Sequence, residues 1–280
     1  MLEFREAIRR TELKLDLLEQ GEKLESESKR LDADIHRLRI IAHNEQADVE
    51  NIKTPGIKGL LLGITGRKQE VLEKEEAEAR NAKQQYDFAV ARKESVLGSL
   101  SKCTEELTSL GACEEDLREM LSVPEDEALS VLMKCSADLP LLRQQISDLF
   151  GALTKVSQLG SIRNGTQSPL AMADTDDKLR SAERKAQNML IQLKEDIKSY
   201  EVRLAPFGIA LDNEDLQSVR DDYLTELYSY AMITSHVEKV IVVLRQIGFR
   251  MDALTPRLTQ LTLDQQKKYL RTLLDASRGK

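Results

Sequence analysis

The sequence predicts an all-α, extended protein: a long antiparallel coiled-coil hairpin followed by a second helical hairpin or bundle region. Two observations support this prediction. Of the 280 residues, 41% are hydrophobic but only 4% are aromatic, none is Trp, and 32% are charged. This composition is typical of long helices packed in twos or threes, and it lacks the aromatic filling of a thick globular core. Apolar residues also recur with the 3.5-residue period of coiled coils over long segments.

The first arm of the predicted hairpin has a stripe of mainly small or apolar residues, with spacings of four and three in alternation. The stripe consists of Leu17, Gly21, Leu24, Ser28, Leu31, Ile35, Leu38 and Ala42. The positions between them are mostly charged or Gln, as a solvated face requires. We therefore expect one face of this helix to contact a partner helix along its length.

The second arm repeats the pattern in two rows that recur every seven residues. The rows are Leu72, Ala79, Tyr86, Lys93, Leu100 and Leu107, and Ala82, Ala89, Val96, Cys103 and Leu110. Two such arms joined by a short turn pack antiparallel, so that facing residues have numbers that sum to about 121. Arms of roughly 40 residues would each span about 60 Å. We expect the hairpin over 1–122, with its tip at 53–68 and Gly111 closing the second arm.

The region after the hairpin predicts short helices and then a linker. The segment Ser122–Glu125 matches a capping box, with Ser followed three residues later by Glu, and predicts the start of a helix. Pro140 predicts a break in that helix. We therefore expect a collar of short helices over 123–160. Residues 161–177 are rich in Gly, Ser, Asn, Pro and Asp, which predicts a flexible linker.

The remaining residues, 178–280, predict a C-terminal helical hairpin with short end helices. Heptads resume at Leu179 and end before Pro206. Either Asp212 or Asn213 is expected to cap the return helix.

Two further features of this C-terminal region carry predictions. The segment 237–247 is apolar on more than one face, so it should lie at the centre of a bundle or in an oligomer interface. The pairs Thr255-Pro256 and Thr262 with Gln265 are capping signals, and they predict one or two short helices at the end of the chain.

Charge and cysteine usage limit the classes of function. The net charge of −7 argues against nucleic acid as a partner, because phosphate contacts need a basic face. Cys103, Cys113 and Cys135 have no CxxC spacing, which is not a disulfide framework and fits a reducing compartment. The first residues alternate charges, and no run approaches the roughly 18 apolar residues that a membrane span needs. We expect a cytoplasmic protein, either free or peripheral at a membrane.

The sequence contains no pattern typical of a catalytic centre. His36 and His43 lie seven residues apart on one helix face, but no third ligand stands at metal-binding spacing. The glycines of the tip do not match a phosphate-binding loop, which needs GxxxxGK followed by Ser or Thr. We therefore expect no catalytic residues, no metal and no cofactor, and a protein that is not an enzyme.

The predicted tip has the most distinctive composition in the chain. Residues 51–69 contain no acidic side chain. The candidate contact residues are Lys53, Ile57, Lys58, Leu60, Leu61, Leu62, Ile64, Arg67 and Lys68. An apolar patch of this kind is rarely left exposed on a monomer. Three interpretations remain open: docking into a partner protein, shallow insertion into an anionic membrane surface, or packing against the protein's own chain.

These observations lead to one expectation of function and one alternative. We expect a non-enzymatic coiled-coil scaffold or adaptor that forms a homo-oligomer and presents its basic, apolar tip to a protein partner. The alternative is a peripheral membrane protein attached by residues 53–68 to an anionic membrane surface.

Overall fold

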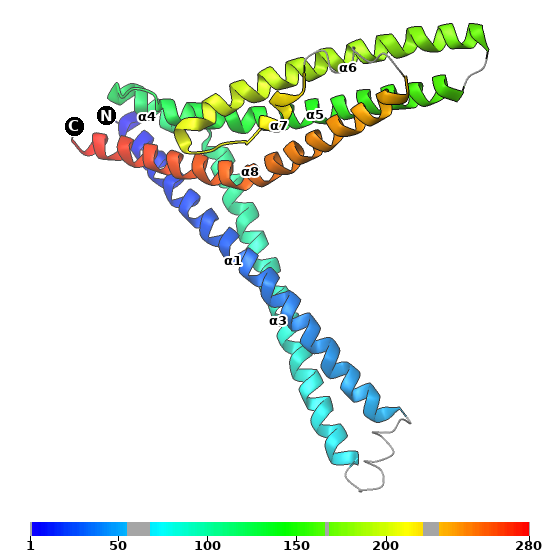
Figure 1. The fold of residues 1–280 in the computed structure, drawn as a ribbon. Coiled ribbons are helices and arrows are strands. Elements are labelled where there is room, and N and C mark those ends of the chain that lie inside the picture. The colour runs from blue at the N-terminus through cyan, green and yellow to red at the C-terminus, as the bar shows by residue number, and fades with distance from the viewer. Residues whose placement is uncertain (1, 55–67, 166–167, 221–229, 280) are drawn as a thin grey trace. The chain divides into compact units, whose positions relative to one another are not determined.

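The computed structural model describes residues 2–54, 68–165, 168–220 and 230–279. Every regular element among these residues is a helix (Figure 1). The chain divides into two compact units, one made of residues 1–123 with 270–280 and the other of residues 124–269. The predicted all-α class is confirmed.

The first unit is built on two long helices, α1 (Leu2–Lys53, 52 residues) and α3 (Lys68–Leu110, 43 residues). They lie side by side over most of their length (Figure 1). Their directions are opposite, because Leu17 of α1 contacts Cys103 of α3 while Lys53 contacts Glu76. At 1.5 Å per residue the helices are about 78 and 65 Å long. This confirms the extended antiparallel hairpin, and we call the α1–α3 pair the rod.

The seam of the rod is formed by residues that the heptad pattern predicts. Cys103 Sγ donates a hydrogen bond to the carbonyl of Leu17 at 3.1 Å, and these residue numbers lie within one helical turn of the predicted register. Five α3 positions of one heptad row are no more than 9% exposed: Ala82, Ala89, Val96, Cys103 and Leu110. Many of the seam residues are small, which lets the two helix backbones approach closely.

Gly98 within α3 and Gly111 at its end should respond in opposite ways to replacement by alanine. Gly98 is exposed within the helix, and a Cβ atom there would meet nothing within 4 Å. We expect Gly98→Ala to stabilise the rod by about 1 kcal/mol, since alanine is the better helix former. Gly111 ends α3 with φ of +57°, a left-handed conformation that costs alanine about 1 kcal/mol.

Thermal unfolding followed by circular dichroism should therefore show a higher Tm for Gly98→Ala and a lower Tm for Gly111→Ala. The two variants carry the same chemical change and serve as controls for each other. A shift of the same sign in both would contradict the assigned helix end.

A short helix that the sequence analysis did not predict, α4 (Cys113–Leu121), follows the rod and packs against α1. It ends at Ser122, which has φ of 55° in the left-handed region. Ser122 therefore closes one helix and does not open the next, so the predicted capping box is wrong. Asp126 caps the next helix instead, because its Oδ1 accepts the backbone N–H of Leu129 at 2.9 Å.

Helix α5 (Glu127–Gly165, 39 residues) passes through Pro140 without a break. The predicted collar of short helices is therefore replaced by one long helix. Proline costs about 3 kcal/mol inside a helix, but Pro140 faces solvent while its neighbours Leu139 and Leu142 are buried. Core contacts on both sides of the proline offset its local cost.

Helix α6 (Pro169–Leu204, 36 residues) covers most of the segment predicted to be a linker. Its first residue is a proline, a residue well suited to the first turn of a helix. Thr175 is buried one turn before Leu179, and its hydroxyl donates to the carbonyl of Ala171 at 2.7 Å. The polar composition of 169–177 therefore belongs to an amphipathic helix, and the linker prediction is wrong there.

The chain after α6 also differs from the prediction. It forms the 3₁₀ turn η1 (Ala205–Phe207) and the five-residue helix α7 (Glu214–Ser218). Asn213 stands at the N-cap position, but its side chain donates to Glu201 Oε2 at 2.7 Å and makes no cap bond. Val219 is extended, so the predicted continuous return helix from 212 or 213 does not form.

The last helix, α8 (Tyr230–Arg278, 49 residues), continues through Pro256 without a break. The predicted short end helices are wrong. The hydroxyls of Thr255 and Thr262 donate to the carbonyls of Met251 and Leu258, one turn back in the same helix. These threonines therefore belong to the helix interior and do not cap new helices.

The core of the second unit lies between α5, α6 and α8, which run side by side (Figure 1). Each helix contributes side chains with no exposed surface: Leu149, Leu153, Leu190, Ile197, Tyr200 and Leu244. The Tyr200 hydroxyl donates to the carbonyl of Cys135 at 3.0 Å. This unit is a three-helix bundle. It confirms the predicted second helical hairpin or bundle region, and α5 is a long helix that the prediction did not include in it.

Candidate functional site

In the sequence, the candidate contact residues run from the end of α1 to the start of α3. Lys53 is the last residue of α1 and Lys68 is the first of α3. The other candidate residues lie outside the described residues: Ile57, Lys58, Leu60, Leu61, Leu62, Ile64 and Arg67. The two helix ends that segment 54–67 connects, Lys53 and Lys68, lie at the end of the rod farthest from Leu2.

A cross-helix ion pair closes the rod next to this segment. Lys53 Nζ lies 2.7 Å from Glu76 Oε1. The hydrogen bond from Lys53 and its positive charge lower the pKa of the Glu76 carboxyl. Both side chains are partly exposed, so the pair adds little to stability. It nevertheless joins the last residue of α1 to a residue of α3 about two turns after that helix begins.

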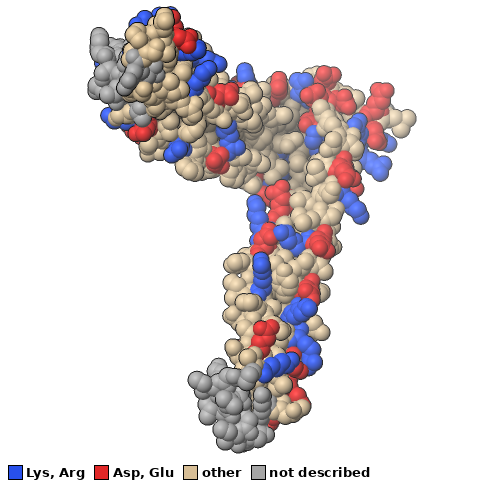
Figure 2. Space-filling view, turned by 90° about the vertical axis from the view of Figure 1, so that its right-hand side faces the viewer, with Lys and Arg blue, Asp and Glu red and all other residues tan. Residues whose placement is uncertain are grey.

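The surface of the rod carries both signs of charge. Figure 2 shows Lys and Arg side chains interspersed with Asp and Glu along it. Arg92 bonds to Glu27 at 2.6 Å, and Lys93 pairs with Asp32 in the same region. The rod thus contrasts with residues 51–69, which contain four basic and no acidic side chains.

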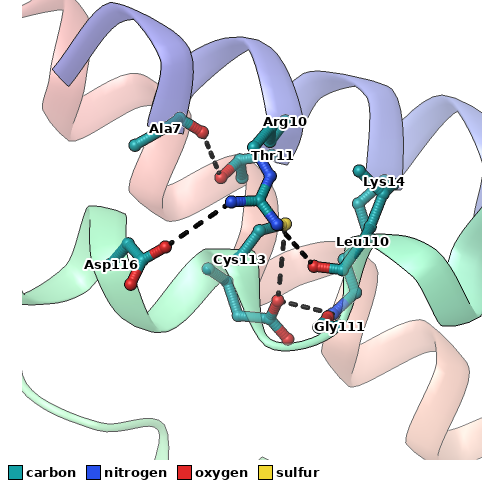
Figure 3. Close-up of polar contacts among 9 residues, drawn as sticks. Ala7, Arg10, Thr11, Lys14, Leu110, Gly111, Cys113 and Asp116 are labelled. Atoms are coloured by element: carbon teal, nitrogen blue, oxygen red, sulfur yellow. Dashed lines mark hydrogen bonds and ion pairs between the residues drawn. The ribbon is translucent and has the colours of Figure 1, made fainter. Parts of the chain in front are cut away.

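A group of polar contacts joins α1, α3 and α4 at the other end of the rod (Figure 3). Arg10 Nη2 donates to the carbonyl of Leu110 at 3.0 Å, and Lys14 Nζ donates to the carbonyl of Gly111 at 2.6 Å. Lys14 also contacts Glu114 Oε2 at 2.5 Å. Two cations therefore satisfy the last carbonyls of α3, where the helix dipole favours positive charge. We call Arg10, Lys14 and Glu114 the clasp.

Cys113 lies beside the clasp, but its environment does not suit nucleophilic chemistry. Cys113 is only 2% exposed, and burial raises the pKa of its thiol. A reactive cysteine needs a lowered pKa and access to solvent. Burial also raises the pKa of Cys103 and Cys135. The role that the geometry supports for the clasp is to cap α3 and hold α4. The sequence analysis missed it, although the four-residue spacing of Cys113, Leu117 and Leu121 indicates a helix.

A separate groove of about 720 Å³ lies between α5 and α6 in the second unit. Its floor includes Ala152, Ala182 and Met189, and Lys155 and Lys185 stand at its edge. Among the described residues its polar lining consists of one carboxylate, Asp148, two serines and three lysines, without a cysteine or a histidine.

Comparison with family models, curated proteins and solved structures finds no match to this chain. Its function must therefore be argued from its own residues.

One group of acidic side chains among the described residues has ligand atoms close enough to share a cation. It consists of Glu45, Asp48 and Glu75, whose oxygens lie within 4.8 Å of one another near the far end of the rod. Neither His36 nor His43 belongs to it, and both are exposed. Asp48 is exposed and the two glutamates are half-buried, and carboxylates near the surface are common on charged helices.

No helix within the described ranges has an apolar stretch long enough to cross a membrane.

Proposed function

We propose that this protein is a non-enzymatic coiled-coil scaffold that presents segment 54–67 to a partner protein. The observation that supports this proposal is the position of the segment. It joins α1 and α3 at the end of a rod whose helices have 52 and 43 residues. A long two-helix rod places a short segment tens of ångströms from the start of α1, as a spacer does.

The composition of the segment suits docking. Ile57, Ile64 and the run Leu60–Leu62 provide apolar side chains, and Lys58 and Arg67 flank them with positive charge. Apolar residues that enter a groove supply most of the affinity in helix and peptide docking. The flanking cations would favour a partner groove with an acidic rim, through electrostatic complementarity.

The rod provides defined support for such a segment. Its helices are joined near the tip by Lys53 with Glu76, at mid-length by Arg92 with Glu27, and at the other end by the clasp. Exposed pairs contribute little stability individually. Together with the buried seam they specify one register, so the two helix ends that the segment joins are held at a defined point.

Photo-crosslinking from position 61 tests the proposal directly. A photoreactive amino acid in place of Leu61 should crosslink to a specific protein in cells, and the same amino acid in place of Phe88 should not. Phe88 is a suitable control because it is 71% exposed on the rod.

The identified protein should then bind the purified wild-type chain and the Phe88→Glu variant, and fail to bind Leu61→Glu. Helicity measured by circular dichroism should be equal in all three. Equal crosslinking from positions 61 and 88, or partner binding that survives Leu61→Glu, would refute the proposal.

The absence of acidic residues from 51–69 favours a second candidate, attachment to an anionic membrane. Apolar residues would enter the headgroup region while Lys and Arg contact lipid phosphates. Co-sedimentation with phosphatidylglycerol vesicles at low and high salt tests it, with phosphatidylcholine vesicles as the control. Salt-sensitive binding that Leu61→Glu abolishes and Phe88→Glu preserves would favour the membrane over a protein partner.

A further inference from the structure

A second apolar groove, of about 550 Å³, lies between the start of α1 and α4 in the first unit. Its floor is Ala7, which is 5% exposed, and its apolar walls are Leu2 and Met120, which are 87% and 42% exposed. Leu2 is therefore almost fully exposed at the edge of the hollow, and Met120 is exposed over part of its surface. We call this surface the base groove.

The rim of the base groove is acidic. It carries Glu3, Glu6 and Asp116. Glu3 and Glu6 are exposed and form no ion pair with any described residue, whereas Asp116 lies 3.8 Å from Arg10. Arg10 also donates a hydrogen bond to the carbonyl of Leu110. The charge of the groove is therefore the opposite of that on residues 51–69.

This complementarity identifies an occupant. Segment 54–67 with its flanking lysines is apolar and basic, and the base groove is apolar and acidic. We propose that the segment 54–67 of a second copy of this chain docks in the base groove. The inference rests on the proposed function, in which the segment is a docking element, and it names a second copy as one of its partners.

The segment of the same copy cannot reach its own groove. Glu3 and Lys53 stand fifty residues apart in one continuous helix, or about 75 Å. The 14 residues between Lys53 and Lys68 are tied at both ends, so they reach back at most about 25 Å. The contact must join two copies. Since each copy offers one groove and one segment, the contact is heterologous and repeats from copy to copy, into a closed ring or an open chain of protomers.

Sedimentation velocity of charge-reversed variants tests this contact. The groove variant is Glu3→Lys with Glu6→Lys, and the tip variant is Lys58→Glu with Arg67→Glu. The control is Glu12→Lys with Glu25→Lys, which makes the same charge change at exposed α1 positions outside the base groove. Wild type and control should form concentration-dependent assemblies that become smaller as salt rises, because salt screens the charges.

Each charge-reversed variant should sediment as a monomer by itself, with unchanged helicity. An equimolar mixture of the two should associate again, because it contains an unmodified groove on one variant and an unmodified segment on the other. A synthetic peptide of residues 53–68 should also bind wild type, and bind the groove variant weaker by about tenfold or more.

Three results would overturn the inference: a wild type that is monomeric at every concentration, association that survives reversal of the groove charges, or a mixture that stays monomeric. These results leave the proposed function standing if position 61 still crosslinks to a different protein. Conversely, if position 61 crosslinks to no other protein but the chain still self-associates as described, only the proposed docking to a different protein is refuted.

Discussion

Replacing Leu244 by alanine should lower the free energy of unfolding of the second unit by about 3 kcal/mol. Leu244 has no exposed surface and belongs to the core shared by α5, α6 and α8. Its truncation removes buried methyl groups and leaves a cavity that long, paired helices fill poorly. Urea unfolding followed by circular dichroism measures the loss, and hydrogen exchange assigns it to these helices.

Val242 provides the matched control for this substitution. It lies two residues away in the same helix but is 50% exposed. Val242→Ala should therefore cost less than about 1 kcal/mol. Similar losses for the two variants would contradict the assignment of Leu244 to the core.

The same measurement decides between two interpretations of the apolar segment 237–247. If this segment were an oligomer interface, the effect of Leu244→Ala would depend on protein concentration. We expect no such dependence, because Val237, Val240, Leu244 and Ile247 are all buried within the single chain.

Replacing Lys14 by methionine should destabilise the first unit by about 2 to 3 kcal/mol. The Lys14 side chain is only 9% exposed and bonds both to Glu114 and to the carbonyl of Gly111. Methionine keeps much of the stem packing but leaves a carboxylate and a carbonyl without their cation. Removing one partner of a buried pair costs more than the pair contributes, since the remaining charge is left desolvated.

Two further variants separate this explanation from a simple loss of packing. Lys29→Met changes an exposed lysine on the same helix and should alter stability by less than about 0.5 kcal/mol. Adding Glu114→Gln to Lys14→Met should restore part of the loss, because it removes the unpaired carboxylate. Urea unfolding measures all three, and faster hydrogen exchange in α4 is expected for Lys14→Met. A double variant less stable than Lys14→Met would contradict this account.

The sequence predicted where the candidate site lies in the hairpin, but not the contacts that support it. The absence of acidic residues from 51–69 and the heptads on both sides locate the segment at the end of a hairpin. The structure adds the bounds of its support, Lys53 and Lys68, and the ion pair of Lys53 with Glu76. The base groove could not be predicted, because it needs α4 to pack against the start of α1, more than a hundred residues away in the sequence.

The sequence by itself determined the rod. A contact between two helices depends on a local repeat, so the rows containing Ala82, Ala89 and Val96 predict both the pairing and the buried face. The same holds for Gly111, where only a residue without Cβ adopts the left-handed turn at low cost.

Only the tertiary structure decided how the other helices begin and end. Pro140, Pro256 and the polar residues 169–177 all favour interruption locally, yet each lies within a long helix. Conversely, the apparent helix start at Asn213 lasts only five residues, and its side chain bonds to Glu201 in place of the helix N-terminus. Local signals of this kind are worth about 1 to 3 kcal/mol. The burial of Leu149, Leu190 and Leu244 against one another, from three distant parts of the chain, outweighs them.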